Sequence, residues 1–343
     1  MARYISTLLV SLALSFSLIW GWVAFAPLAY LDPEYPAWLA KQQMLASCNL
    51  GNLIVVGDSR AAVDIIPAAL PVLTTNLAVG GGSPIEAFVA ISRAFNCASP
   101  PHRVIVSFDA AHFTEPDLFW ERSVRFGFIA PEDLDELHRV SQQLGDSSIY
   151  ELRRNGLPSW LRSVLYTARF PTFYFNSLAK GGIFLRWWNN RASLAEVTAA
   201  RGHYFFGVAP GSNMVAVEGY MRTFKPLPVL GYYFDRLLAL LANHRVEVDF
   251  VAMPMNQATR EAVRSDVSEG FAAYLSSCAA RYPNFHVIGE AMPDWPDRWF
   301  GDGFAHLNPA GAQRFSAQLA AWLSATAGRT TEHAERSAKG MVQ

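Results

Sequence analysis

The sequence predicts an α/β protein built on a parallel sheet with helices on both faces. Residues 53–56 and 103–108 are apolar, largely β-branched runs without polar alternation, as in strands that are buried on both sides. Helical patterns separate these and three further strand patterns along the chain. Such alternation is typical of a three-layer α/β/α architecture with a parallel sheet.

The expected elements follow one another from residue 53 onward. We predict strands at residues 53–56, 72–76, 103–108, 246–253 and 285–288, with helices at 61–70, 85–95, 232–243, 271–281 and 309–324. At 343 residues and 51% hydrophobic side chains, the chain can bury a large core. We therefore expect one domain over residues 32–325, followed by a polar, disordered tail at 326–343.

Composition excludes one class of partner. The formal net charge is −1, and no basic run or stripe is present. A protein that binds nucleic acid through its phosphates needs such a positive surface. Nucleic acid is therefore not an expected partner.

The first 31 residues predict a single transmembrane anchor. Residues 4–30 contain no charged side chain and are long enough to cross a bilayer, with Trp20, Trp22 and Tyr30 near one end, where interfacial aromatics belong. Arg3 precedes this stretch and acidic residues follow it, which places the N-terminus in the cytoplasm.

A cleaved signal peptide is the alternative for the same segment. Ala24-Phe25-Ala26 has the small-x-small pattern of a cleavage site. Two features oppose this alternative: the apolar run is long for a signal peptide, and Pro27 would follow the cut. Either interpretation puts the rest of the chain outside the cytoplasm.

The strand–helix alternation stops between residues 114 and 230, where aromatic side chains are concentrated. One interpretation is a helical insertion with its own core. The other is a cap over the functional site, or a surface that lies on the membrane or on a membrane partner. The two interpretations are compatible.

Three cysteines are present, and an oxidising compartment allows a pair of them to bridge. Cys48 precedes the first predicted strand and Cys97 the third. If those strands are neighbours, the two thiols meet at one sheet edge, so we predict a Cys48–Cys97 disulfide with Cys278 left over. None of the three has a companion at metal-ligand spacing, and we predict neither a metal nor a cofactor.

The candidate site begins where the first strand ends, at Gly57-Asp58-Ser59. A serine at such a strand-to-helix turn stands at the carboxyl edge of the sheet, where open α/β sheets bind ligands. Asp302 and His306 lie late in the chain, within 302–311. A nucleophile, a base and a group that orients the base are what acyl transfer through serine requires. The alternatives are structural roles without chemistry: Ser59 as a helix cap, His306 as a loop residue and Asp302 as a turn former.

These motifs resemble the SGNH (GDSL-like) hydrolase superfamily. Gly57-Asp58-Ser59 matches its first block, with Ser59 as nucleophile. The stretch 76–81 resembles its second block, with Ala78 at the first glycine and Gly81 at the oxyanion position. In the fourth block, the Asp302 to His306 spacing is one residue longer than the usual Asp-x-x-His, and the usual Leu-Asn-Pro-x-Gly follows. The resemblance implies a flavodoxin-like sheet.

The third block departs from the family pattern. Asp109 stands where the family has an asparagine that binds the oxyanion. An ionised carboxylate would repel an oxyanion, so Asp109 cannot simply replace that asparagine. The change predicts a slow or specialised enzyme, or one that has lost efficient chemistry.

Two features resemble the membrane-anchored, DltD-like branch that works with membrane-bound O-acyltransferases. One is the single N-terminal anchor. The other is Met253-Pro254-Met255-Asn256, which resembles the Pro-x-Asn of that branch and makes Asn256 a candidate substrate-binding residue. The resemblance implies a single-pass protein of the bacterial inner membrane with its domain on the periplasmic side. It also implies transfer or removal of O-acyl, most plausibly O-acetyl, groups on a cell-envelope or exported polysaccharide, with a multi-pass O-acyltransferase as partner.

Two other functions stay open from the sequence. The altered third and fourth blocks favour a non-catalytic assembly or glycan-binding protein that keeps the fold. The aromatic middle favours a plain lipase or esterase. Reactivity of Ser59 separates the first of these from the enzymatic interpretations.

Overall fold

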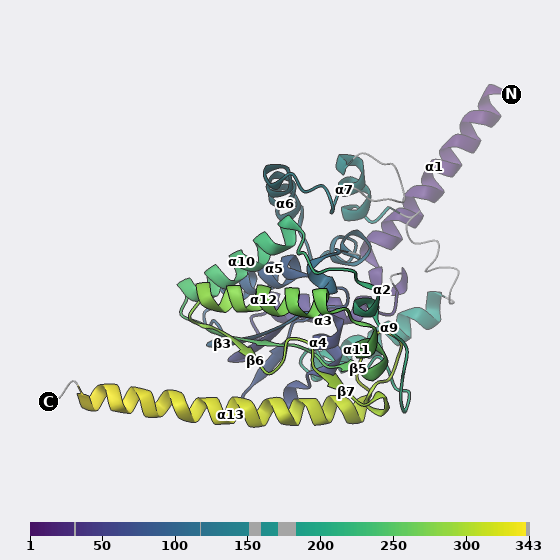
Figure 1. The fold of residues 1–343 in the computed structure, drawn as a ribbon. Helices are drawn as coiled ribbons and strands as arrows, with labels where there is room; N and C mark the ends of the chain where they lie inside the picture. The colour runs from purple at the N-terminus through teal and green to yellow at the C-terminus, as the bar shows by residue number, and fades with distance from the viewer. Residues whose placement is uncertain (31, 117, 151–158, 171–182, 341–343) are drawn as a thin grey trace.

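The computed structural model describes residues 1–30, 32–116, 118–150, 159–170 and 183–340 and has the α/β class that the sequence predicts. Its main sheet has five strands, all parallel, in the order β2-β1-β3-β4-β6 (Figure 1). Their bounds are β1 Leu53–Gly57, β2 Thr74–Asn76, β3 Arg103–Ser107, β4 Glu247–Val251 and β6 Phe285–Ile288. A second, two-stranded sheet pairs β5 (Met255–Asn256) with β7 (Asp294–Trp295).

Both faces of the sheet are buried, as the apolar runs predict. In β1, Ile54 and Val56 belong to one hydrophobic core, whereas Leu53 and Val55 belong to another. This division follows from the alternation of side chains along a strand. The central strands therefore need apolar residues at every position.

Helices cover each face. The first core contains residues of α3 (Tyr35–Ala46), α5 (Pro84–Ala94), α10 (Pro228–Asn243) and α12 (Ser265–Arg281). The second contains residues of α4 (Ser59–Asp64) and α13 (Pro309–Gly340). Short segments complete this part of the chain: α2 (Pro27–Tyr30), α11 (Gln257–Ala262), η1 (Pro67–Ala69), η2 (Ala111–Phe113) and η6 (Asp297–Trp299).

Several helix boundaries differ from the expectation: α10 and α12 begin earlier than expected, at Pro228 and Ser265. The helix expected at 61–70 is divided into α4 and η1, since Pro67 cannot continue an α-helix ladder. The closing helix α13 does not end near residue 324 but continues to Gly340, through the stretch expected to be disordered, and projects from the body of the protein (Figure 1). Residues 325–340 contain four alanines and no proline, so no residue in this stretch removes a backbone N–H from the helical hydrogen bonds.

The described part of the insertion 114–230 contains several helices, and its buried side chains belong to the first core of the domain, so the expected separate core is not found there. Its elements are η3 (Phe119–Val124), α6 (Pro131–Leu144), α7 (Ser159–Thr167), α9 (Ile183–Ala199) and η5 (Val217–Tyr220). Phe126 and Phe128 are buried and pack edge-to-face on Trp38 of α3. Trp120 and Tyr166 are buried as well. Other aromatics of the insertion, Phe173, Tyr174 and Phe175, lie outside the described residues.

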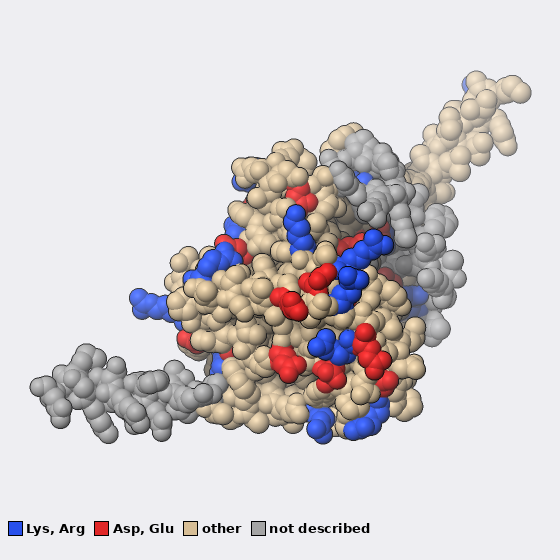
Figure 2. All heavy atoms as spheres, in the orientation of Figure 1, with Lys and Arg blue, Asp and Glu red and all other residues tan. Residues whose placement is uncertain are grey.

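The N-terminal helix α1 (Ala2–Phe25) is long and apolar enough to cross a membrane, and only 6% of its most apolar 18-residue window is buried. It projects away from the sheet domain (Figure 1). In Figure 2 it is almost free of charged atoms, while acidic and basic side chains intermingle on the visible face of the domain. A single-pass anchor is consistent with both features.

The end of α1 contacts the insertion. The indole N–H of Trp20 donates to the carbonyl of Ala168 at 2.8 Å, and Phe170 packs edge-to-face on the Trp20 ring. Beside this contact, α7 exposes Trp160 and Val164 one turn apart. An apolar face therefore continues from the anchor onto α7.

The predicted disulfide is confirmed: Cys48 and Cys97 are bridged. The strands that follow them, β1 and β3, are neighbours in the sheet, which is the condition on which the pairing was predicted. Cys278 is buried and free.

Candidate active site

Ser59 stands at the carboxyl edge of the sheet, between β1 and α4. A Cβ on Gly57 would lie 1.9 Å from the carbonyl oxygen of Ser107, so only glycine lets β1 approach β3 there. The carboxylate of Asp58 accepts the backbone N–H groups of Arg60 and Ala61 at 2.9 and 3.3 Å. Asp58 therefore caps α4 and fixes the turn that presents Ser59.

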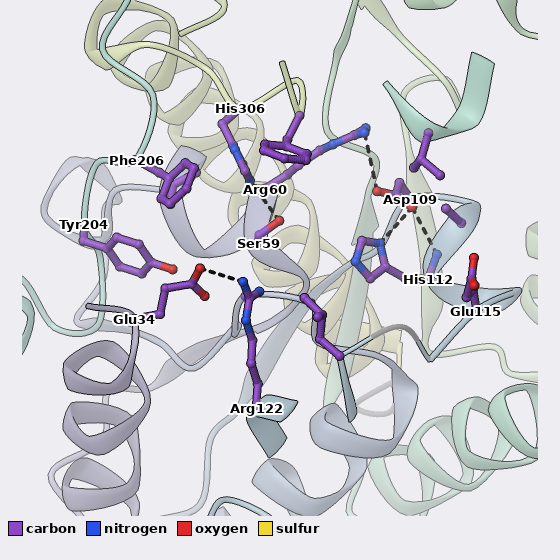
Figure 3. A pocket seen from close by; sticks show the side chains of 17 residues that line it. Glu34, Ser59, Arg60, Asp109, His112, Glu115, Arg122, Tyr204, Phe206 and His306 are labelled. Atoms are coloured by element: carbon purple, nitrogen blue, oxygen red, sulfur yellow. Dashed lines mark hydrogen bonds and ion pairs between the residues drawn. The ribbon is translucent and has the colours of Figure 1, made fainter. Parts of the chain in front are cut away.

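The structure brings the three predicted catalytic residues together. His306 Nε2 lies 2.9 Å from Ser59 Oγ (Figure 3). His306 Nδ1 lies 2.6 Å from Asp302 Oδ2. A carboxylate at Nδ1 holds the proton there and leaves Nε2 to accept the serine proton. These are the contacts of a nucleophile, a base and a group that orients the base, across 247 residues of sequence.

The spacing of four residues from Asp302 to His306 includes one unusual backbone conformation. Ala305, directly before His306, has φ = +62°, in the left-handed region that residues other than glycine rarely adopt. Asp302 Oδ1 closes the turn by accepting the N–H groups of Phe304 and His306 at 3.0 and 3.1 Å. These contacts hold the turn in which the Asp302 carboxylate reaches the ring of His306.

The charge on Asp302 is stabilised in place. Partial burial opposes its ionisation, but the hydrogen bond and charge of His306, together with the two backbone N–H groups, outweigh burial and lower the pKa of Asp302. Asp302 is therefore an anion at neutral pH, as its role beside an imidazolium requires.

Ser59 and His306 open into a cavity of about 430 Å³ (Figure 3). Its polar wall includes Glu34 and Arg122, whose side chains pair at 2.6 Å. Burial raises the pKa of Glu34, although Arg122 opposes the shift. The remaining wall is mainly apolar and aromatic, with Val63, Ala111, Leu118, Tyr204, Phe206, Val217 and Phe304.

Gly81 lines the same cavity, as predicted. Its φ is +73°, and a Cβ there would lie 3.0 Å from Leu118 Cδ1. Within the described part of the chain, neither Gly81 N–H nor Ser59 N–H has a hydrogen-bond acceptor. Both N–H groups are therefore available to a ligand in the cavity.

Two buried side chains hold the loop that carries Gly81. Asn76 donates to the carbonyl groups of Ala61 and Ile65, and its own oxygen accepts the N–H of Ala78 at 3.1 Å. Lys41 of α3 donates to the carbonyl of Ala78, and burial lowers the pKa of Lys41 to about 7. The loop is thus tied both to α4 and to the helix that follows the anchor.

Asp109 also lines the cavity, but it belongs to an ion-pair cluster. Its Oδ2 lies 3.5 Å from Arg60 Nη2, and its Oδ1 lies 2.8 Å from His112 Nδ1. Arg60 is buried and pairs through both guanidinium nitrogens with Glu218, at 2.6 and 2.8 Å. Burial opposes ionisation of Asp109, but His112 and Arg60 outweigh it and hold its pKa well below the usual range.

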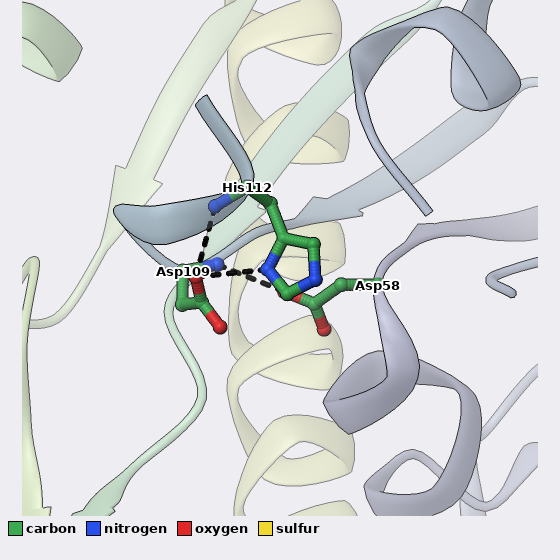
Figure 4. A group of neighbouring side chains, drawn as sticks. All are labelled: Asp58, Asp109 and His112. Carbon is green, nitrogen blue, oxygen red and sulfur yellow. Dashed lines mark hydrogen bonds and ion pairs between the residues drawn. The ribbon is translucent and has the colours of Figure 1, made fainter. Parts of the chain in front are cut away.

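Asp58, Asp109 and His112 offer ligating atoms within 4.8 Å of one another, which is the spacing of a metal site (Figure 4). Their donor atoms are already engaged. Asp58 Oδ2 accepts the N–H of Asp109 at 2.9 Å, and His112 Nδ1 faces two carboxylates, at 2.8 and 3.3 Å. A ring nitrogen between two carboxylates carries a proton, whereas a metal ligand needs that lone pair. We assign the group to the ion-pair cluster.

Asn256 does not line the cavity, so the structure does not support its predicted role in substrate binding. It is buried at the start of α11, where its oxygen accepts the N–H of Thr259 at 3.0 Å. Its amide donates to the carbonyl groups of Ser212 and Met214. Met214 packs against Gly303 of the loop that carries His306. Asn256 therefore stabilises that loop indirectly, through Met214.

Sequence reasoning did not find several side chains of the site. Arg60 directly follows Ser59, and an arginine at that point of a buried turn is a signal for a buried acid nearby. His112 follows Asp109 by three residues, but a single histidine near a strand end is no specific signal. Nothing in the sequence around Glu34 or Glu218 indicates that they belong to the site. Glu34 reaches it from the segment between α2 and α3, and Glu218 reaches it from the insertion.

In comparisons with protein-family models, curated proteins and solved structures, nothing matches this chain. Function is therefore inferred from the residues and their geometry.

Proposed function

We propose that this protein is a membrane-anchored serine esterase or acyltransferase of the SGNH (GDSL-like) type. The observation that carries the proposal is the hydrogen-bonded series Ser59, His306 and Asp302, of which Ser59 and His306 line a cavity. The order of the main strands, second-first-third-fourth-fifth, supports a flavodoxin-like sheet of the kind such enzymes use. The assembled site disfavours a purely structural role.

The proposed reaction proceeds through an acyl-serine. Ser59 Oγ attacks the carbonyl carbon of an ester while His306 Nε2 takes the hydroxyl proton. The carbonyl π electrons move to oxygen, and the N–H groups of Ser59 and Gly81 stabilise the resulting oxyanion. Collapse of the intermediate expels an alkoxide, which takes the proton from His306. Water or an acceptor hydroxyl then repeats the sequence on the acyl-serine.

The proposed substrate is an O-acyl, most plausibly O-acetyl, group on a cell-envelope or exported polysaccharide. A second cavity of about 500 Å³ shares Glu34, Tyr204 and Phe206 with the catalytic one, which provides room for a chain beyond the reacting ester. Phe205 and Phe206 are exposed there and offer ring faces to sugars. Small acyl groups fit the apolar wall beside Ser59.

The proposed location is the bacterial inner membrane with the domain on the periplasmic side. The apolar helix α1 supports an anchor, and the Cys48–Cys97 disulfide supports an oxidising compartment. The exposed Trp160 and Val164 of α7, beside the end of α1, support contact with the bilayer surface or with a multi-pass O-acyltransferase.

A lipid esterase is the second candidate. The mainly apolar catalytic cavity, with Glu34 of the anchor linker in its wall, favours it. An acyl-chain series of 4-nitrophenyl esters separates the two candidates. A polysaccharide O-acetyl enzyme prefers acetyl, whereas a lipid esterase gains rate with chain length.

The test of the proposed function uses the full chain in detergent micelles, treated with a fluorophosphonate and then measured by intact mass. We expect one adduct on the parent, none on Ser59→Ala and a much slower one on His306→Ala. Asp266→Asn, on the exposed face of α12, is a control that should label like the parent. A folded parent that forms no adduct contradicts the proposal.

A further inference from the structure

Asp109 occupies the place at the end of β3 where a neutral donor to the oxyanion is expected, and its low pKa makes it an anion. Gly57 and Ser107 are paired across β1 and β3, so Asp109 follows its strand beside the turn that presents Ser59. An anion facing the cavity directly would raise the energy of an oxyanion. Another group must therefore stand between Asp109 and the oxyanion, or offset the negative charge of Asp109 with a positive one.

His112 is that group. Its Nδ1 lies between Asp109 Oδ1 and Asp58 Oδ2, at 2.8 and 3.3 Å, out of line with either hydrogen-bond direction but paired with both charges. Its ring lines the cavity that contains Ser59 (Figure 3), and its side chain is 20% exposed. Within the described residues, Nε2 has no hydrogen-bond partner.

The surrounding charges favour a protonated ring. Burial alone disfavours the charged form, but Asp109 and Asp58 outweigh it, against a smaller opposing effect of Arg60, and raise the pKa of His112 to about 9. Glu218 stands behind Arg60 and neutralises much of its charge. The other ionisable groups of the cavity are Glu115 on the same wall and Glu34, Arg122 and His306 elsewhere in the lining.

We propose that His112, held as an imidazolium by Asp109 and Asp58, donates its Nε2–H to the oxyanion formed when Ser59 attacks an ester. It completes the set of donors begun by the N–H groups of Ser59 and Gly81, in place of an asparagine. His112 keeps its proton throughout: the proton in transit passes only between Ser59, His306 and the leaving alkoxide. This role rests on the proposed function and adds a catalytic residue to it.

His112 can donate a hydrogen bond from Nε2 to the oxyanion only while its ring is protonated. A neutral His112 keeps its remaining hydrogen at Nδ1, between the two carboxylates, and turns a lone pair at Nε2 toward the cavity. The acylation rate should therefore fall as pH rises through about 9. Asp109→Asn removes the largest charge that favours the protonated ring, so this fall should move to lower pH.

The test measures the acylation rate constant of the full chain in micelles with 4-nitrophenyl acetate, from pH 6 to pH 10. We expect His112→Ala to acylate roughly 100-fold more slowly, the typical effect of losing one such donor. His112→Gln keeps a neutral donor and should retain part of the rate without the alkaline fall. His286→Ala, at an exposed histidine of β6, is the matched control and should behave like the parent.

Each outcome decides a separate point. His112→Ala acylating at the parental rate, or Asp109→Asn keeping the parental alkaline limb, overturns the role of His112 and leaves the proposed function intact. A parent without any acyl adduct at Ser59 overturns the proposed function and this role with it. Thermal unfolding of each variant checks that lost rate is not lost fold.

Discussion

Asp302→Asn is the change that tests the catalytic geometry most directly. The carboxylate has three partners: Oδ2 faces His306 Nδ1, and Oδ1 accepts the N–H groups of Phe304 and His306. An asparagine has one oxygen and one NH₂ group. If its oxygen keeps the two backbone bonds, its NH₂ faces His306 Nδ1 and selects the tautomer with hydrogen at Nε2, which cannot accept the proton of Ser59.

The opposite orientation of the amide is worse, because it places NH₂ against two backbone donors. The wrong tautomer should therefore dominate. In serine triads this change costs about 10⁴ in rate. Asp302 is partly exposed, at 16% of its side-chain surface, so water can replace it in part. We expect a loss on the order of 10³, or about 4 kcal/mol of transition-state stabilisation.

The assay is the acylation burst with 4-nitrophenyl acetate, followed by stopped flow for the parent, Asp302→Asn and the Asp266→Asn control. Asp302→Asn should keep its thermal unfolding temperature within a few degrees, because the backbone contacts of the loop remain. An Asp302→Asn variant that retains a third of the parental rate with the same pH profile refutes the role of Asp302 as the group that orients His306.

Three further predictions follow from the same structure. Gly81→Ala places a Cβ 3.0 Å from Leu118 at a positive φ. We expect the resulting strain to lower the free energy of unfolding, measured with a chemical denaturant, by roughly 1–2 kcal/mol. We also expect the acylation rate to fall by about 10², because the N–H of residue 81 is displaced. The folded-state pKa of His112 is raised to about 9, so its stabilising contribution is complete below the unfolded pKa of about 6.5 and is lost as pH rises through about 9. Between these pH values the free energy of unfolding of the parent should fall by about 3 kcal/mol more than that of His112→Gln, and parallel curves would contradict the assignment of this charge. Reduction of Cys48–Cys97, which closes a loop of 49 residues, should lower the free energy of unfolding by about 4 kcal/mol, measured with and without dithiothreitol beside a Cys48→Ser/Cys97→Ser variant that should not respond.

The sequence located the main strands and the proposed nucleophile Ser59 for the same physical reason. A strand buried on both faces must be apolar at every position, and a turn at its carboxyl end must expose a polar residue. Because of these two requirements, Leu53–Gly57 can be recognised as a strand and Ser59 as the polar residue after it without any tertiary information. The disulfide could be predicted for a related reason, since both cysteines precede strands of one sheet.

The prediction for Asn256 was wrong because position relative to a strand does not say which way a side chain points. It follows β4 near the sheet edge, but its amide turns to the 212–214 loop and away from the cavity. The backbone of α13 continues to Gly340, through residues whose polar composition predicts a disordered tail.

What the sequence determined by itself is local chemistry: an apolar N-terminal helix long enough to cross a membrane, buried strands, and a serine, a histidine and an aspartate of the types that acyl transfer needs. What only the tertiary structure decided is which distant charges meet. Arg60 lies beside Glu218, and Glu34 pairs with Arg122, because the insertion and the anchor linker fold over the same sheet edge. Buried charges of this kind are stable only with a partner, and the partner's position depends on the packing of the whole chain.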